Sequence, residues 1–527
     1  MNLCHQAQLQ LATNKMQPLE KHLLKSDVSF DGGDLDCGNG LLLLIRKYID
    51  PLERGQLLEI LSTDLSVKED LPAWCRMTEN ELISIVKNKN QFSYLVIKGK
   101  LSDRATSSET KIYVTQVSQI VTPVKILDPL PNPVSAPLIA PLSVMGVGSW
   151  PRPRWMLDAI HNSMEKKIDE QTFQATADDA VRLAVAAQLR AGVDVVTDGE
   201  QRRDSYASFV GGILDNCQLI PLTDLLPLVD HPEEFERELR ALDIPASDVR
   251  HPAVFGPLGR SKPLAVHEYT FLKTLTDKPT KVALPGPYLL TRTMWLECVS
   301  DRTYKTREHL ATDIIRILRE EIACLLAAGV ALVQLDEPVL SEVVFSGGTN
   351  KRSFMCGALG EKEKPEIELA FARDLINSVT KGFPQERIAL HMCRGNWSTD
   401  ESVALSGSYA SLTPTLAKLN VGILLLELCT PRSGEMEILK KIPDHIRIAV
   451  GVCNQKHSRV ESVDEIIAKG SRAISLFGAE RVLFCPDCGF ATFADNPIST
   501  AVIAEQKLKA ISEAVQILRK RNNSNIR

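Results

Sequence analysis

The chain has 527 residues, of which 44% are hydrophobic and 24% charged, and its formal net charge is -5. This balance is typical of a globular protein, and its basic residues alternate with acidic ones, so we expect no nucleic-acid partner. No apolar run approaches the roughly 20 residues that span a bilayer, and the amino terminus lacks a signal-peptide pattern. The twelve scattered cysteines are more typical of buried thiols or metal ligands than of a disulfide scaffold. We therefore expect a cytoplasmic protein without membrane contact.

The first 141 residues predict a tail, a small domain and a linker. Residues 1–30 are polar and irregular, which indicates a flexible tail. Residues 31–117 contain an apolar run, a strand-like segment at 57–64, a helix-like segment at 74–88 and an alternating strand at 94–99, a pattern that predicts a small two-layer α/β domain. Residues 118–141 are too rich in proline for a helix or a central strand, so we expect an extended linker.

From residue 142 to 527 amphipathic helix patterns alternate with short β-branched runs. Each of five helix-like segments precedes an apolar run, and Gly192 and Gly329 stand where a helix should end. This alternation predicts a (β/α)8 TIM barrel, with a doubly wound open sheet as the alternative. No glycine-rich phosphate loop opens these helices, which weakens the alternative. Residues 213–265 form a long acidic insertion that either acts as a lid or covers the barrel.

Polar residues follow several of the predicted strands, where a barrel places its site. They are Asp198 and Glu200, Asp336 and Glu337, His391 and Cys393, Glu427, and Cys485 and Cys488. Alternation along an extended segment places His391 and Cys393 on one side, where they could share a metal ion. Cys488 and Glu427 could complete a tetrahedral Zn²⁺ site. The alternatives are a buried His–Cys pair, a redox or structural role for the Cys485–Cys488 pair, and helix caps at Asp336 and Glu337.

Residues 142–520 resemble the catalytic barrel of cobalamin-independent methionine synthases and their single-barrel relatives. The matching segments are VGSW (147–150), TDGEQRR (197–203), LPGPYLLTRTMW (284–295), QLDEP (334–338), HMCRGNW (391–397), LLLELCTPRSG (424–434) and CPDCGF (485–490). The resemblance implies zinc bound by His391, Cys393 and Cys488, with Glu427 as a fourth ligand. It also implies that Val147, Gly148 and Ser149 hold the carboxylate of homocysteine, and that Glu200 and Asp336 hold its amino group.

The segment GVCNQKHS (451–458) departs from the family pattern. Lys456 occupies the place of the family's catalytic histidine and His457 follows one residue later, so we carry both as catalytic candidates. The amino-terminal barrel of the full-length enzymes is absent, and RGN and NQK are more similar to the single-barrel relatives. The methyl donor is therefore left open between a folate and a corrinoid.

Residues 33–100 resemble the TusA-like sulfur carriers. The resemblance rests on LDCGNGLLLLIRK (35–47) and GQLLEILSTDLSVKEDLPAWCR (55–76). Members of that family carry a persulfide on a cysteine at the start of the first helix, where the helix dipole lowers the thiol pKa. Cys37 is the corresponding candidate, whereas Cys75 is expected in the core. A sulfur-relay protein is then a possible partner of this domain.

Together these patterns predict a zinc-dependent methyltransferase that acts on a thiol, homocysteine above all, to give methionine. Two alternatives stay open. One is alkyl transfer to another thiol from an epoxide-type donor. The other is a sulfur-relay carrier whose barrel is not catalytic.

Overall fold

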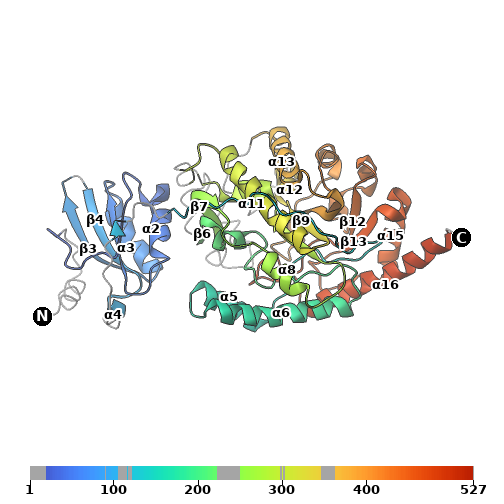
Figure 1. Cartoon of the computed structure of the whole chain (residues 1–527), viewed down its shortest axis with the longest axis horizontal. Helices are drawn as coiled ribbons and strands as arrows, with labels where there is room; N and C mark the ends of the chain where they lie inside the picture. The colour runs from blue at the N-terminus through green and yellow to red at the C-terminus, as the bar shows by residue number, and fades with distance from the viewer. Residues whose placement is uncertain are drawn as a thin grey trace.

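The computed structural model describes residues 19–89, 91–104, 115–116, 121–221, 250–296, 300, 303–345 and 363–525. A small amino-terminal domain lies beside a larger barrel (Figure 1). None of the helices in these ranges is both long and apolar enough to cross a lipid bilayer.

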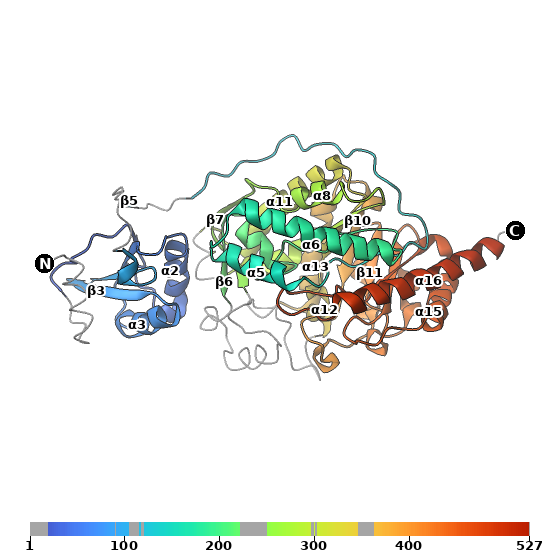
Figure 2. The ribbon, with the colours of Figure 1, turned by 90° about the horizontal axis from the view of Figure 1, so that it is seen from below.

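The small domain is a sheet with helices packed on it, as predicted. Its strands are β1 (Val28–Asp31), β2 (Leu57–Ser62), β3 (Glu81–Asn88), β4 (Gln91–Ile97) and β5 (Thr115–Gln116), in the spatial order β3-β4-β2-β1-β5. Its helices are η1 (Cys37–Leu41), α2 (Leu42–Ile49), α3 (Val67–Met77) and α4 (Leu101–Arg104). The apolar faces of α2 and α3 share one core with the sheet, and α2 lies on the side toward the barrel (Figures 1 and 2).

Two segments of this domain differ from the prediction. The helix predicted for 74–88 is wrong in its second half, because α3 ends at Met77 and residues 81–88 form β3, paired antiparallel with β4. The alternating Ile83, Ile85 and neighbouring apolar side chains favour a strand once β4 offers a partner. Contacts to this domain also come from residues before 31: Leu19 bridges Val86, and His22 contacts the hydroxyl groups of Ser84 and Ser93 at 2.7 and 2.8 Å.

The larger unit is a closed barrel of parallel strands. Six strands pair in sequence order, namely β8 (Lys281–Pro285), β9 (Leu332–Asp336), β10 (Ile388–Met392), β11 (Ile423–Leu426), β12 (Arg447–Cys453) and β13 (Val482–Pro486). Two shorter extended segments close the ring by parallel bridges: Val144 pairs with Phe484, Met145 with Val195, and Val196 with Thr280. The predicted TIM barrel is thereby confirmed.

Helices cover the outside of the barrel. They are α5 (Arg154–Met164), α6 (Glu170–Arg190), α8 (Val266–Leu272), α9 (Pro287–Met294), α11 (Arg307–Ala328), α12 (Val339–Phe345), α13 (Pro365–Thr380), α14 (Thr413–Leu416), α15 (Val463–Phe477) and α16 (Ala501–Asn525). Short helical turns are η2 (Ser208–Gly212), η5 (Gln385–Arg387), η6 (Glu401–Val403), η7 (Tyr409–Ser411), η8 (Pro431–Ser433), η9 (Met436–Lys441) and η10 (Ala479–Arg481). Gly329 ends α11 at φ +101°, the left-handed conformation expected of a glycine C-cap.

Two connecting segments matter for the site. Residues 121–140 contain no helix or strand and run along the outside of the barrel (Figure 2). The ends of the 213–265 insertion form an antiparallel hairpin of β6 (Asp215–Pro221) and β7 (Arg250–Gly259). The stretch between these strands, for which a lid was considered, lies outside the described residues.

Candidate metal centre

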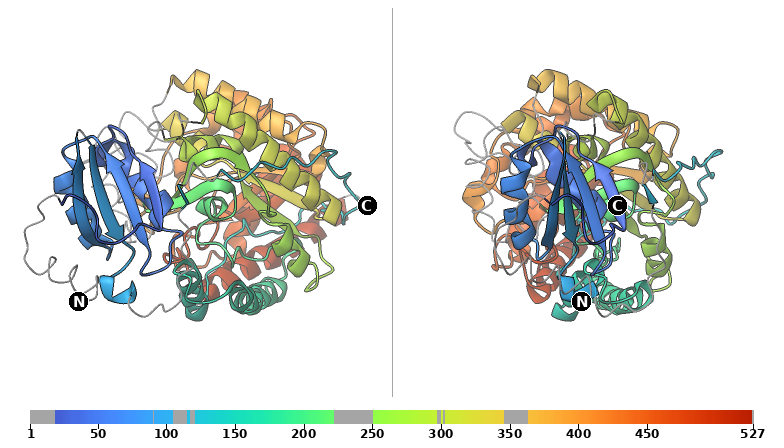
Figure 3. Two further views of the ribbon diagram at one scale, coloured as in Figure 1. Left: turned by 60° about the vertical axis from the view of Figure 1, so that its left-hand side comes forward. Right: turned by 90° about the vertical axis from the view of Figure 1, so that its left-hand side faces the viewer.

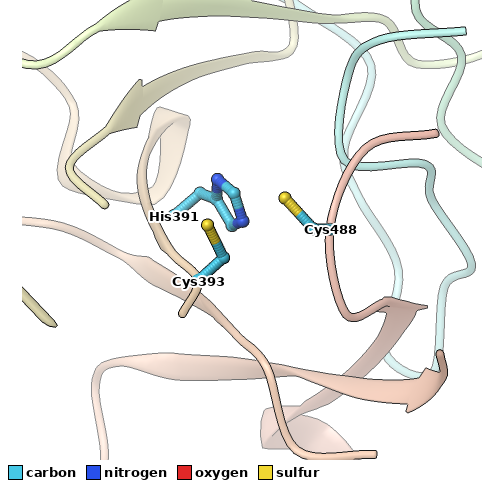
Figure 4. A group of neighbouring side chains, drawn as sticks. All are labelled: His391, Cys393 and Cys488. Carbon is cyan, nitrogen blue, oxygen red and sulfur yellow. The ribbon is translucent and has the colours of Figure 1, made fainter. Parts of the chain in front are cut away.

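His391, Cys393 and Cys488 meet at the carboxyl ends of the barrel strands. Each offers one ligand atom, and the three atoms lie within 4.8 Å of one another. His391 is the next-to-last residue of β10, Cys393 follows that strand directly, and Cys488 follows β13. Their side chains point toward one another (Figure 4). All three are buried. Alternation along the chain predicted that His391 and Cys393 lie on one side, and the closure of the barrel brings Cys488 to them.

The imidazole of His391 is oriented for a metal ion. Its Nδ1 lies 3.0 Å from Oδ1 of Asp336, while its Nε2 is buried without a hydrogen-bond partner. A carboxylate on one ring nitrogen and an open second nitrogen form the usual arrangement of a metal-binding histidine. Two thiol ligands and one such imidazole suit Zn²⁺. The residues present therefore fit this ion.

The two thiols of the group interact with each other. The hydrogen bond from Cys488 lowers the pKa of Cys393, so Cys393 is the first of the pair to lose its proton. The same bond, together with burial, raises the pKa of Cys488. A pair that gives up one proton readily can present a thiolate to a cation.

Cys485 lies apart from this group. It belongs to the apolar interior of the barrel with Met145, Leu425 and Leu483, and its Sγ donates to the carbonyl of Ala449 at 3.6 Å. Burial raises its pKa to about 12, so its thiol stays protonated. The chain turns after β13, and Cys488 instead reaches the pocket at the barrel mouth.

Glu427 lies next to the three residues but is not a member of the group. Its carboxylate accepts from the backbone N–H of Arg394 at 3.0 Å and from Nε of Arg432 at 2.7 Å. Its charge is close enough to raise the pKa values of both thiols. Because Glu427 is not among the grouped ligand atoms, its coordination of a metal ion stays a prediction.

A pocket opens on the three residues, and the predicted substrate-binding residues line it. It is bordered by Val147, Gly148, Ser149, Glu200, Tyr206, Asp336, Pro338, His391, Cys393, Asn396, Trp397, Cys488, Gly489, Thr492 and Phe493. The five residues expected to hold an amino acid are therefore in one cavity with the three candidate ligands. Their roles there stay predictions.

Glu200 and the loop at Gly148 fit closely against each other. A Cβ on Gly148 would overlap Oε1 of Glu200, so a larger residue there requires the loop or the Glu200 carboxylate to move. Glu200 itself has φ +55°, an uncommon conformation for a residue with a side chain, and its amide donates to Oδ1 of Asp198 at 2.9 Å. Burial raises the pKa of Glu200 to about 7, and its Oε2 has no hydrogen-bond partner. A cation in the pocket would satisfy that oxygen.

Lys281, inside the barrel, forms hydrogen bonds with two segments that border the pocket. Its Nζ donates to the carbonyls of Gly146 at 2.6 Å and Val147 at 2.7 Å, and to Oε1 of Gln334 at 2.6 Å. Gln334 in turn donates to Oδ1 of Asp336 at 2.7 Å. Burial lowers the pKa of Lys281 to about 8. This lysine was not among the predicted residues; the signal available was its position at the start of an apolar barrel strand.

Glu337, the neighbour of Asp336, is a helix cap. Its carboxylate accepts from the backbone N–H groups of Tyr288 at 2.7 Å and Leu289 at 2.9 Å, at the start of α9. Burial raises its pKa to about 8. The cap interpretation therefore describes Glu337, whereas Asp336 faces the pocket.

The two catalytic candidates, Lys456 and His457, do not line the pocket. Lys456 is buried and donates to the backbone carbonyl of Ser398, and burial lowers its pKa. His457 is half exposed and contacts Glu401 with its Nε2 at 2.5 Å. Glu401 also pairs with Arg432, the partner of Glu427. Their catalytic role stays a prediction.

Several pocket residues were missed by the sequence analysis. Tyr206, Trp397 and Phe493 supply aromatic walls, and Asn396 donates to the carbonyl of Gly489 at 2.7 Å. Asn396 and Trp397 stand directly after the candidate ligands in HMCRGNW, so their proximity in the chain was a usable signal. Tyr206 and Phe493 lie in loops without a strand-end pattern.

In the small domain, Cys37 begins the helical segment η1–α2, as predicted. It is buried, and burial together with Asp70, Asp36 and Asp64 raises its pKa to about 12. Its thiol is therefore protonated at neutral pH. Cys75 packs in the same core, as expected.

Comparison with known proteins identifies both parts of the chain. The family model "Cobalamin-independent synthase, Catalytic domain" matches residues 243–508, and "Sulfurtransferase TusA" matches residues 40–98. A protein named methionine synthase from Sulfurisphaera tokodaii is 27% identical over 374 residues, which cover 71% of this chain and 91% of that protein. One from Sulfolobus acidocaldarius is 27% identical over 344 residues, or 65% and 84% of the two chains.

Solved structures agree on the fold. A B12-independent methionine synthase from Shewanella, in complex with selenomethionine, superposes with a TM-score of 0.55 at 24% identity, over 73% of this chain and all of that one (100%). A putative one from Listeria monocytogenes gives a TM-score of 0.51 at 19% identity, over 72% and 99%. The matched family model spans half of the sequence and contains the candidate ligands. The chain therefore belongs to the family of cobalamin-independent synthase catalytic domains, carried behind a TusA-like domain.

Proposed function

We propose that this protein is a zinc-dependent methyltransferase that moves a methyl group onto the thiol of homocysteine to give methionine. The observation that carries the proposal is the group His391, Cys393 and Cys488, which faces the same pocket as Glu200 and Asp336. The relatives named methionine synthase support the reaction. A bound zinc ion would supply a site at which the substrate thiol is held as the thiolate, which is the nucleophilic form.

The residues around the pocket provide for the amino-acid part of the substrate. Glu200 and Asp336 would hold the ammonium group between two carboxylates, and Glu200 has an oxygen still without a partner. The backbone at Val147–Ser149 would hold the substrate carboxylate, and Lys281 fixes the position of that loop. Binding at both ends would direct the thiol toward His391 and the two cysteines. Positioning of this kind lowers the barrier of a transfer between two substrates.

A metal analysis tests the ligand set. We expect about one zinc per chain in the purified protein, since two buried thiols and an imidazole form a set of three protein ligands typical of a catalytic zinc site. Cys393→Ser and Cys488→Ser should lose the metal, while Cys485→Ser, whose thiol faces the barrel interior, should keep it. Zinc retained in Cys488→Ser, or lost in a folded Cys485→Ser, would contradict the assignment. Glu427→Gln measures whether a fourth ligand comes from this residue.

A transfer assay tests the reaction and identifies the donor. Homocysteine-dependent demethylation would be measured with methyltetrahydrofolate and with methylcobalamin in parallel, and methionine would be quantified by mass spectrometry. Methionine formed with either donor supports the proposal and names the donor. No methionine with both, from zinc-loaded protein, would contradict methyl transfer to homocysteine and leave an epoxide-type donor to be tested.

For the small domain we propose a sulfur-handling role centred on Cys37, supported by the match to the TusA family model. The buried, protonated thiol means that the surrounding segment would have to open before Cys37 reacts. Mass spectrometry after exposure to a persulfide donor tests this. A sulfur adduct on Cys37 supports the role, while no adduct, with full activity of Cys37→Ser, would exclude it.

A further inference from the structure

The proline-rich segment is fixed to the barrel along its length. Four side chains bind its backbone at separated places. Near its start, Asn216 exchanges hydrogen bonds with Thr122 at 2.8 and 3.0 Å, and Glu320 accepts from Leu127 N at 3.3 Å. Farther along, Arg387 donates to Val134 O at 2.6 Å, and Arg447 donates to Ile139 O and Ala140 O at 2.8 and 2.9 Å. The prolines remove backbone donors and stiffen the chain, and the barrel supplies donors to the carbonyls that remain. Residues 121–141 thus form a strap and not a free tether.

The strap runs from one end of the barrel to the other. It starts near the small domain and reaches the far end of the barrel (Figure 2), where the extended segment Val144–Met145 follows it in the chain. The amino ends of the strands therefore lie far from the small domain, and their carboxyl ends, which carry the candidate metal centre, lie toward it. In the view with the small domain facing the reader, this domain lies in front of the ring of barrel helices (Figure 3, right).

The small domain also contacts the barrel directly through α2. Nε2 of Gln218, in β6, donates to the carbonyl of Arg46 at 3.1 Å and to Oδ2 of Asp50 at 2.8 Å. Nζ of Lys47 lies 3.5 Å from the carbonyl oxygen of Phe255 and 5.4 Å from the centroid of its ring, in β7. Asp50 is partly buried at this contact, and burial raises the pKa of its carboxyl group. The β6–β7 hairpin follows the second barrel strand and so rises from the carboxyl-terminal end of the barrel.

We propose that the strap and the α2–hairpin contact hold the small domain as a fixed cap over the mouth of the barrel, where it restricts the approach to the pocket. The partner of the α2 face from Arg46 to Asp50 is then the barrel of the same chain. A separate protein that exchanges sulfur with the small domain must use another face. The cap would restrict access to the pocket whether or not the group transferred is methyl.

Photo-crosslinking in the full-length protein tests the position of the cap. With p-benzoylphenylalanine in place of Phe255, we expect a crosslink within one chain to residues of α2. The same probe in place of Phe383, at the amino-terminal end of the barrel, should give no crosslink to the small domain. In Arg387→Ala/Arg447→Ala, which removes two of the four attachments of the strap, the yield at position 255 should fall at least about threefold. No crosslink from position 255, a crosslink only between two chains, or an unchanged yield in the strap variant would each overturn the proposal.

A labelling experiment tests the restriction of access without measuring activity. In metal-free protein, the rate at which a bulky maleimide labels Cys393 and Cys488 would be followed by mass spectrometry of the peptides. Gln218→Ala/Lys47→Ala, which breaks the α2 contact, should raise that rate at least about threefold, while Arg182→Ala, an exposed arginine on α6, should not. Equal rates in the contact variant and the parent protein would overturn the restriction of access.

Discussion

Nζ of Lys281 lies 2.6 Å from Oε1 of Gln334, and through this bond the centre of the barrel is connected to His391, a candidate metal ligand. Gln334 orients Asp336, and Asp336 orients His391. The same ammonium group holds the carbonyls of Gly146 and Val147. One buried lysine thus positions both the loop expected to bind the substrate carboxylate and the carboxylate expected to bind its ammonium group.

Lys281→Met keeps the size of the side chain and removes all of these hydrogen bonds. Each buried group left without a partner costs about 1–3 kcal/mol, so the variant should unfold at a lower temperature. Its KM for homocysteine should also rise, by about tenfold or more, because the loop and Asp336 lose their common support. Lys278→Met is the control, since Lys278 precedes β8 and donates to the carbonyl of Val193, which is not part of the pocket. It should lose stability with an unchanged KM, and equal KM values in both variants would remove the positioning role.

Asp336→Ala should weaken zinc binding. A group that accepts a hydrogen bond from the second ring nitrogen of a metal-binding histidine typically contributes a factor of about 10–100 to the metal affinity. Competition against a chromogenic chelator measures this directly. Glu337→Gln is the matched control, because the neighbouring carboxylate caps α9 and touches no candidate ligand. A zinc affinity unchanged in Asp336→Ala would mean that His391 is held by other contacts.

The sequence predicted the barrel and the place of the site because both depend on local patterns. Helix-then-strand alternation can be recognised from residues that are neighbours in the chain. The residues that follow parallel barrel strands all lie at the carboxyl-terminal end of the barrel. His391 and Cys393 could be predicted as site residues from these local patterns. The choice of Cys488 over Cys485 needed the family resemblance, since the turn after β13 decides which thiol leaves the barrel interior.

What the sequence did not predict depends on partners that are distant in the chain. Residues 81–88 form a strand because β4 pairs with them, and Glu337 is a cap because α9 begins beside it, 50 residues earlier in the chain. The burial of Cys37 and the contacts of the strap likewise depend on three-dimensional neighbours. A proline-rich composition predicts an extended segment, but it carries no information about the arginines that bind it.

Binding of homocysteine should weaken as the pH falls through about 7. Burial raises the pKa of Glu200 to about 7, and only the ionised carboxylate attracts the substrate ammonium group. Below that pH the group is neutral, so KM should rise by about tenfold between pH 8 and pH 6, with the slope of a single ionisation. Glu200→Gln should have a high KM with little of this dependence. A thiol without an amino group, used as a competitive inhibitor, should show no such change; the same change with that thiol would assign the titration to another residue.

Gly148→Ala should strongly weaken substrate binding without loss of the metal. Its Cβ would overlap Oε1 of Glu200, so either the loop that faces the substrate carboxylate or the carboxylate of Glu200 has to move. A displacement of about 1 Å at such a position can cost about a hundredfold in rate. Gly146→Ala is a demanding control, because a Cβ there meets nothing within 4 Å although the residue lies two positions away in the same loop. We expect kcat/KM to fall about a hundredfold in Gly148→Ala and less than about twofold in Gly146→Ala, with equal zinc content in both. A comparable loss in the two variants would show that loop flexibility, and not the close fit to Glu200, governs binding.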